Sequence, residues 1–515
     1  MRRILGLTVA FALSCFVQCV GDPGTAPIPV DAGSDVGSPT DGAVTDAGVD
    51  SGEPVPKGDI AWVKTYGTTR DANGVAVDGK GNAYVVGAYV AVSKAVPVGN
   101  LNLPITTSPD AYAIKLDPNG NPLWAKTFGG ASQDAFIDVA VDTSGDLYVI
   151  GFTNSPSITF KGTIASATPA SLWGFLTKLS GVDGSPQWEV PIVANQALTT
   201  IVTAVGATKV YVGTTFGGTL DAGAGGLLPT KGSVDFAIME IDMTSHTVGW
   251  VKQIGGAGPE AIHDLTVGPK GDIYFAAQFG GAITSTGLGA KAPAQVGTGY
   301  NALLAKLAPD GTAVWATAYG DAVNQKETAG YGVAVDRTGT RVALSGNFNG
   351  GVDFGMGALG SAGQQDGFLV SVDDNGPKTK WQKTFGGSAT DFGTRVAFDP
   401  WGNVIATGYY LSTDAKIDGK TLPAIPTTNE IGTYLCKVKV DGTLAWAKGA
   451  IPVASDAGLG GGPVPLGLAV SSAGRILLSG KQFKSAADYG DGVVHTFLSP
   501  PGVGADDSFI GSWNP

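Results

Sequence analysis

Four acidic residues at similar places along the chain are the best candidates for a site that does chemistry. Each stands close to the start of a short apolar segment, and Glu327 lies near such a start in its own unit. Carboxylates gathered at one mouth could bridge a calcium ion, which prefers oxygen ligands, whereas acids at wet loop ends can equally be solvated turns. The four residues are Asp71, Asp134, Asp264 and Asp391. We predict no cofactor, with calcium at these acids as the alternative.

Other catalytic combinations are hard to assemble from this sequence. Histidine occurs only at His246, His263 and His495, without the spacing of a metal site. No Gly-x-Ser-x-Gly elbow is present, and the strand-like surroundings of Cys436 suit a buried apolar residue better than a nucleophile. Paired carboxylates for glycoside cleavage stay open, because distant acids can converge in a folded chain. The sequence therefore favours a binding role over an enzyme.

The N-terminus has the pattern of an export signal. Arg2 and Arg3 precede an apolar run that is too short to span a bilayer. A cysteine follows at the expected cleavage point, as in bacterial lipoproteins, where the thiol carries the lipid. We favour Cys19 over Cys15, with an ordinary cleaved signal as the alternative. Residues 1–19 are then the signal, and the mature protein is exported, either to the outer membrane or cell surface or into the medium.

Residues 20–57 predict a disordered acidic tether. Positions 21–57 hold seven acids and one lysine among repeated Asp, Ala, Gly and Pro, with no aromatic residue. Such a segment cannot bury enough apolar area to fold. The formal net charge of the whole chain is −12. Because phosphate binding needs concentrated Lys and Arg, nucleic acid is not an expected partner, and the only expected membrane contact is through the N-terminal lipid.

The element that must position any site is a tandem repeat. Seven tryptophans recur every 62 to 66 residues, namely Trp62, Trp124, Trp188, Trp250, Trp315, Trp381 and Trp446. Trp513 follows at a similar interval, but within its unit it occupies the position that Leu116 occupies in the first unit, so it is not an eighth repeat tryptophan. Each period holds four short alternating segments separated by turns, as in residues 137–142, 147–152 and 174–179 and the strand of Trp188.

Counting these segments predicts closure of a ring. Residues 59–67, which carry Trp62, match the fourth segment of the repeat but come before the first copy of its first segment. The last unit of the chain lacks a fourth segment with a tryptophan. We therefore predict that residues 58–515 form an all-β, seven-bladed β-propeller of four-stranded antiparallel blades, closed by the N-terminal strand in the last blade.

The repeat resembles a known bacterial family of propeller repeats called SBBP. The shared motif is Asp-Ala-aromatic-x-x-Lys-Leu-x-x-x-Gly-x-x-x-Trp, followed by Gly-Gly and a Val-Ala-Val-Asp-x-x-Gly-Asn-x-Tyr-Val-x-Gly strand pair, and it covers residues 59–513. The resemblance implies an extracytoplasmic propeller and no particular catalytic set. Leu-Asp-x-x-Gly-x-x-x-Trp also resembles the docking motif of quinoprotein dehydrogenases, which implies packing of the tryptophans between blades.

Two further expectations concern loops and exposed faces. The segments between second and third strands, among them 91–109, 217–234, 280–299 and 411–432, could build a binding rim or fold back as hairpins over blade edges. Third-strand lysines alternate with apolar residues and are expected to be exposed; they are Lys115, Lys178, Lys306 and Lys437. His246 takes the place of turn glycines, which predicts a positive φ.

The function that these features predict is a monomeric, lipid-anchored envelope scaffold that binds protein or polysaccharide. The alternative is a secreted propeller hydrolase or lyase acting on polysaccharide, and a third reading is a quinoprotein-like dehydrogenase.

Overall fold

The computed structural model describes residues 58–66, 71–91, 94–165, 172–194, 198–223, 226–427, 430–453, 461–483, 486–490, 494–496 and 507–515. The predicted signal, both candidate lipidation sites, Cys15 and Cys19, and the predicted tether therefore lie outside the described residues. The described part is almost entirely antiparallel β-structure, with one 3-10 turn, η2 (Gly289–Lys291). No helix in it is long and apolar enough to cross a membrane.

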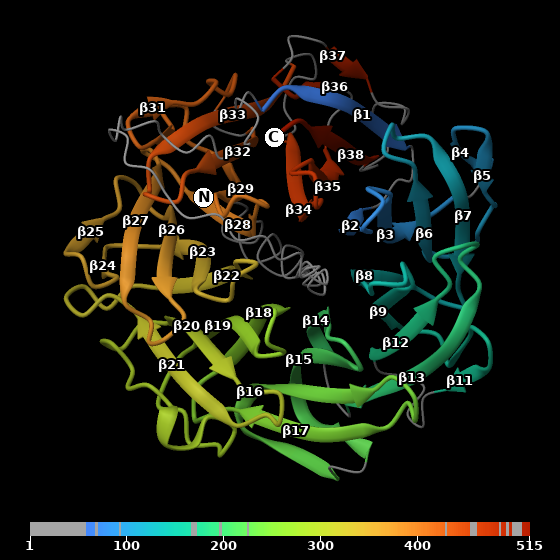
Figure 1. Ribbon diagram of the computed structural model, residues 1–515, viewed down its shortest axis with the longest axis horizontal. Coiled ribbons are helices and arrows are strands. Elements are labelled where there is room, and N and C mark those ends of the chain that lie inside the picture. Colours follow the sequence, from blue (N-terminus) through green and yellow to red (C-terminus); the bar gives the residue numbers. More distant parts are fainter. Residues whose placement is uncertain are drawn as a thin grey trace, which may run out of the picture.

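The strands form a ring of four-stranded sheets around a central axis (Figure 1). In the first four blades the order from the axis outward is as follows. Blade 1 is β2 (Ala72–Val77), β3 (Ala83–Tyr89), β6 (Asp110–Leu116) and β7 (Pro122–Phe128). Blade 2 is β8 (Asp134–Val141), β9 (Leu147–Thr153), β12 (Trp173–Leu179) and β13 (Pro186–Ala194). Blade 3 is β14 (Leu198–Val205), β15 (Lys209–Asp221), β16 (Leu227–Asp242) and β17 (Val248–Ile254). Blade 4 is β18 (Glu260–Val267), β19 (Ile273–Phe279), β20 (Asn301–Leu307) and β21 (Ala313–Tyr319).

The remaining blades repeat this order. Blade 5 is β22 (Thr328–Val335), β23 (Arg341–Phe348), β26 (Asp366–Asp373) and β27 (Thr379–Gly386). Blade 6 is β28 (Asp391–Phe398), β29 (Val404–Tyr410), β32 (Gly432–Val438) and β33 (Leu444–Pro452). Blade 7 is β34 (Pro463–Val470), β35 (Ile476–Gln482), β38 (Asp507–Trp513) and, from the other end of the chain, β1 (Ile60–Tyr66). The all-β propeller predicted from the repeats is confirmed.

The N-terminal strand closes the ring as predicted. β1 pairs antiparallel with β38, with Thr65 opposite Phe509 and Ile60 opposite Trp513. The backbone N–H of Asn514 donates to the carbonyl of Asp59 at 2.8 Å, which joins the two ends where the other blades have a continuous turn. The fourth strand of blade 7 is therefore supplied from some 450 residues away in sequence, and no blade edge is left open at the seam.

The hydrophobic core lies between blades rather than within them. Each main cluster in the described part of the chain combines side chains from two neighbouring blades. One joins the first blade to the last, because Ala469, Leu477 and Ile510 pack with Val75, Val85 and Ile114. Every junction around the ring has such a cluster. Loss of one blade would consequently expose two apolar faces.

The repeat tryptophans hold neighbouring blades together. The indole N–H of Trp124 donates to the carbonyl of Gly181 in the next blade at 3.3 Å, and Trp62 of blade 7 reaches Pro118 of blade 1 at 3.0 Å. The ring of Trp124 lies against the turn glycine Gly184, where a Cβ would come within 3.0 Å. Trp250, Trp315 and Trp381 make the same kind of bond to Pro309, Asp374 and Val440. The predicted packing role explains these residues.

Two positions vary this scheme. His246 has φ of 58°, as its place in the glycine slot predicted, and its ring stacks on Trp188 at 4.6 Å. Trp446 lies over Gly58, which has φ of 59° and would bring a Cβ within 2.9 Å of the indole. Gly58 therefore supplies from the N-terminus the turn glycine that a continuous seventh blade would have carried.

Candidate functional site

The insertions between second and third strands all leave the same face of the ring, which we call the insertion face. The inner strands also begin on this face, because strands one and three run in the same direction. In the described residues five insertions contain short hairpins. Four of these are β4 (Val96–Val98) with β5 (Leu101–Leu103), β10 (Ser157–Thr159) with β11 (Thr163–Ala165), β24 (Gly351–Asp353) with β25 (Ala358–Gly360), and β30 (Lys416–Ile417) with β31 (Lys420–Thr421). In blade 7 the hairpin is β36 (Ala486–Asp488) with β37 (Val494–Thr496).

Three insertions cover the outer edge of the preceding blade. Strand β30 pairs with β27, β36 pairs with β33, and the extended end of β15 pairs with β13. Of the two uses expected for these segments, edge covering is thus the one observed in blades 3, 6 and 7. The pairing also protects strand edges that would otherwise be open to another chain.

The four candidate aspartates do not share one position. Asp134 and Asp391 are each the first residue of an inner strand, Asp264 is the fifth residue of β18, and Asp71 precedes β2. Asp71 lies 3.8 Å from the ammonium of Lys481. No group of three or more His, Cys, Asp or Glu residues in the described ranges is placed to hold a metal ion. The prediction of no cofactor, with calcium at these acids as its alternative, is not tested by this arrangement.

Asp134 and Asp391 are buried and play the same structural part. The carboxylate of Asp134 accepts from the backbone N–H of Gly130 at 2.7 Å and the hydroxyl of Ser155 at 3.1 Å. That of Asp391 accepts from the N–H of Gly387 at 2.8 Å and the hydroxyl of Ser412 at 2.6 Å. Each acid therefore fixes the connection that carries the chain into its own blade.

Asp264 instead joins two inner strands. It sits at a β-bulge, where its two oxygens accept from the N–H groups of Leu265 at 2.8 Å and Val333 in blade 5 at 2.7 Å. Burial raises the pKa of Asp264 to about 7, against the opposing effect of Arg395. Asp138 makes the equivalent link to Thr203 in blade 3 at 2.8 Å. Sequence reasoning missed Asp138, although an aspartate at the fifth residue of both inner strands was a usable signal.

The third-strand lysines are not exposed as expected. Lys306 and Lys437 are buried, and their ammonium groups lie 2.7 Å from Asp374 and 2.9 Å from Asp399. Lys178 pairs with Asp146 at 3.1 Å, and Lys115 donates to the carbonyl of Gly181 at 2.7 Å. The expectation was wrong because a blade packs against neighbours on both of its faces, so neither set of alternating side chains reaches water.

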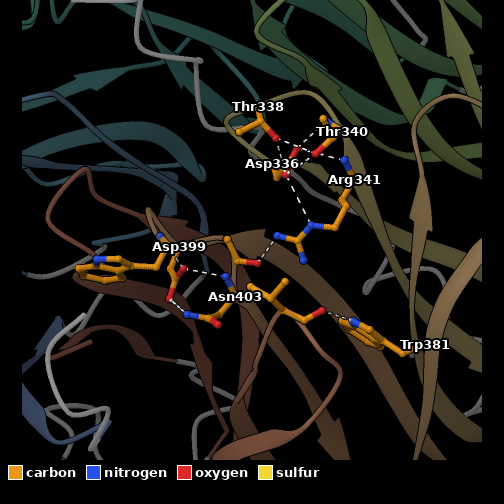
Figure 2. Close-up of polar contacts among 10 residues, drawn as sticks. Asp336, Thr338, Thr340, Arg341, Trp381, Asp399 and Asn403 are labelled. Carbon is orange, nitrogen blue, oxygen red and sulfur yellow. Dashed lines mark hydrogen bonds and ion pairs between the residues drawn. The ribbon is translucent and has the colours of Figure 1, made fainter. Parts of the chain in front are cut away.

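The face opposite the insertions carries polar links between blades, as Figure 2 shows for blades 5 and 6. Arg341 lies 3.6 Å from the carboxylate of Asp336 and donates across the junction to the carbonyl of Gly402 at 2.5 Å. Asp399 accepts from the backbone and side-chain N–H groups of Asn403 at 2.8 and 2.9 Å. Every labelled group thus serves a turn or a blade contact, and none is arranged for chemistry.

The insertion face carries a different cluster around the axis. Tyr331, Phe392, Tyr409 and Phe483 form what we call the inner-rim aromatic cluster. Tyr331 lies 6.4 Å from Phe392, Phe392 stacks on Tyr409 at 4.8 Å, and Phe483 packs against the same apolar group. Tyr331, Phe392 and Phe483 are half-buried. They come from blades 5, 6 and 7, so the cluster forms only when these three blades pack side by side in the ring.

Charged and polar side chains border this cluster. The ammonium of the buried Lys481 lies 4.8 Å from the centroid of Phe483. The ring of His263 is tilted against that of Tyr331 at 4.7 Å, and burial lowers the pKa of His263 to about 3, so the imidazole is neutral at pH 7. Lys481 and His263 are both buried, so they support the aromatic rings from below and are not placed for acid–base catalysis.

The remaining candidate catalytic residues do not converge. His246 packs on a tryptophan, and His495 lies 5.6 Å from Tyr489 in the blade 7 insertion. Cys436 is buried in β32, where burial raises the pKa of its thiol to about 12. Acids that do come together, such as Asp366 and Asp391, are 3% and 0% exposed and cannot flank a polymer.

Comparison with known proteins found similar structures but no similar sequence. No model of a protein family and no curated protein matches the sequence. The structure is similar to the Dos1 propeller, with a TM-score of 0.40 and 9% identity over 88% of this chain and 96% of that one. For U3-55K the TM-score is 0.42, with 10% identity over 89% and 100% of the two chains. For the quinohemoprotein alcohol dehydrogenase of Comamonas testosteroni it is 0.37, with 10% identity over 88% and 76%.

Proposed function

We propose that this protein is an exported, lipid-anchored propeller whose insertion face binds a polysaccharide of the cell envelope. The observation that carries the proposal is the inner-rim aromatic cluster, in which the half-buried Tyr331, Phe392 and Phe483 come together from three blades on the insertion face. Aromatic rings have an apolar face and a fixed geometry, so they offer flat stacking surfaces at low cost in conformational entropy.

A rigid scaffold supports this role. The cluster stands on strands of three blades whose packing against each other fixes its shape, and preorganised sites bind with less ordering cost. Among the described residues, the exposed large apolar side chains are spread over several blades; they are Ile105, Leu123, Val182, Leu227, Val314, Val323, Met356 and Val440. Because a stable protein interface usually needs a contiguous apolar patch, this distribution favours polysaccharide over protein as the partner.

The anchoring part of the proposal rests on the N-terminal sequence. Cys19 follows the apolar run and precedes the acidic segment, which would hold the propeller away from the membrane. Labelled palmitate should be incorporated into the full chain and into Cys15→Ala but not into Cys19→Ala. Labelling of none of the three proteins would refute the anchor while leaving the binding site untested by that experiment.

Binding is tested by affinity for purified envelope polysaccharides, with product analysis in the same samples. Phe392→Ala and Tyr331→Ala should each weaken binding about tenfold, the equivalent of about 1.4 kcal/mol. Tyr300→Ala is the matched control, because Tyr300 is half-buried in the blade 4 insertion, outside the cluster. Equal binding by all four proteins would exclude the cluster as the contact surface. Release of shortened glycans would replace the scaffold with the hydrolase or lyase alternative.

A further inference from the structure

Carboxylates meet in pairs at three alternating blade junctions. One acid lies on a third strand, and the other begins the inner strand of the following blade. In each case a Gly-Gly dipeptide ends four residues before the second acid. The pairs are Asp110 with Asp134, Asp235 with Glu260, and Asp366 with Asp391.

The glycines bring the two acids together. A Cβ on Gly386 would lie 2.7 Å from Asp366 Oδ1 and 2.8 Å from Asp391 Oδ2, so the two carboxylates face one another across this residue. Gly129 and Gly255 leave the same room for Asp110 and Asp235. The N–H of the second glycine then donates to the second acid, at 2.7 Å from Gly130, 2.9 Å from Gly256 and 2.8 Å from Gly387.

Buried oxygens in these pairs have no hydrogen-bond donor. They are Asp134 Oδ1, Asp235 Oδ1, Glu260 Oε1 and Asp366 Oδ1, on side chains that are at most 3% exposed. A buried carboxylate oxygen without a donor is costly, and two carboxylates facing each other are worse. The unpaired oxygens therefore indicate that a cation, either a proton or a metal ion, lies between the two carboxylates of each pair and binds to both.

A proton fits this position better than a metal ion. At Asp391 the four described donors, from Gly387, Leu411 and Ser412, already satisfy an ionised carboxylate, whereas Asp366 accepts from Ala362 on Oδ2 and has no partner on Oδ1. A proton on Asp366 Oδ1 would donate to Asp391 and give the unpaired oxygen of Asp366 a partner. Calcium needs six or more oxygens, and no three ligating side chains in the described part of the chain are grouped for it.

The titration behaviour agrees with this geometry. Burial, and then the neighbouring Asp134, raise the pKa of Asp110 to about 6. Burial and Asp235 raise that of Glu260 to about 7, and burial with Asp391 and Asp414 raises that of Asp366 to about 6. The other titratable groups beside the pairs carry no positive charge that could offset the second carboxylate; they are Asp414, Tyr89, Tyr300, Tyr410 and Tyr434.

We propose that each pair holds one shared proton, which makes the three junctions a built-in pH-sensitive clasp between blades 1 and 2, 3 and 4, and 5 and 6. In each clasp the protonated acid donates to its ionised partner. Loss of the proton to water leaves two carboxylates at the junction, whose repulsion loosens the contact on the insertion face.

The direction of the pH effect follows from linkage. The pKa values of these acids are higher in the folded chain than in the unfolded one, so the folded chain binds more protons. Their contribution to stability is fully present below about pH 4 and is lost as the pH rises through about 6 to 7. The folded protein should therefore melt at a higher temperature at pH 5 than at pH 8.

The test compares the parent with Asp366→Asn, whose amide keeps a donor toward Asp391 without titrating. We expect Asp366→Asn to melt a few degrees above the parent at pH 8 and level with it at pH 5. The control Asp373→Asn removes a carboxylate from the exposed ion pair with Lys380 and should follow the parent's pH dependence. A parent that melts alike at both pH values, or an Asp366→Asn protein that is not stabilised at pH 8, would overturn the clasp.

Two further measurements keep the inference independent of that variant. Infrared spectra of the folded parent should show a band of protonated carboxylic acids that is stronger at pH 5 than at pH 8, and this pH-dependent part should be smaller in Glu260→Gln. Calcium at millimolar concentration should not raise the melting temperature at pH 8. Absence of the band, or a calcium-induced rise that Asp366→Asn abolishes, would assign the junctions to a cation and refute the shared proton.

Discussion

Replacing Lys437 by methionine should destabilise the protein strongly, because this lysine is buried beside one carboxylate. Its ammonium lies 2.9 Å from Asp399 Oδ2, and each side chain is 1% exposed. Methionine keeps most of the apolar stem but removes the cation. Breaking a buried pair on one side typically costs about 3 to 5 kcal/mol, since the remaining charge is left uncompensated. Three N–H donors still reach Asp399, from Trp401 and Asn403, so we expect about 3 kcal/mol.

Urea unfolding followed by tryptophan fluorescence measures this loss, with Lys383→Met as the matched control. Lys383 also pairs with an aspartate, Asp418, at 2.8 Å, but the two side chains are 20% and 40% exposed. Such pairs contribute about 0 to 1 kcal/mol. The double variant Lys437→Met with Asp399→Asn should recover part of the loss, because no buried charge remains. If Lys437→Met unfolded within about 1 kcal/mol of the parent, the buried ion pair would be refuted.

Three other predictions follow from single positions. Gly129→Ala should cost about 1 to 3 kcal/mol, because its Cβ would lie 2.4 Å from the Asp110 carboxyl, whereas Gly79→Ala meets nothing within 4 Å and should be close to neutral in the same unfolding assay. Cys436 should stay unreactive toward a thiol reagent at pH 8 until urea unfolds the chain, since its pKa is about 12 and it is buried; rapid labelling of the folded protein would contradict this. His246→Val should melt well below His246→Gly, because φ of 58° is strained for a β-branched residue; equal melting would show that this turn tolerates any side chain.

The ring was predictable because the signal is spread over the whole chain. The repeat tryptophan occurs in every fourth strand. The strand of Trp62 is one too many at the N-terminus, and the last blade lacks a fourth strand, so the sequence itself indicated that the two belong together. The positive φ of His246 followed in the same way from its place in a slot. Trp513 could likewise be separated from the series, and it lies in the third strand of blade 7.

Interactions between blades were much less predictable. The partner of Lys306 in the next blade, Asp374, is 68 residues away, and nothing in the local pattern separates a buried lysine from an exposed one. The same holds for the acid pairs, because Asp110 and Asp134 gain their meaning only when two blades are packed together. The pairing of insertions with neighbouring outer strands depends on backbone hydrogen bonds, which side-chain patterns do not encode.

The account depends most on closure of the ring by β1, and moving this strand tests it directly. In one variant residues 58–66 are deleted; in the other they are moved behind Asn514, where the bond from its N–H to Asp59 already places them. We predict that the deletion lowers the melting temperature of the whole propeller in a single transition and that the relocated strand restores it. A deletion that melts like the parent, or a relocation that fails to restore the melting temperature, would contradict the closed ring.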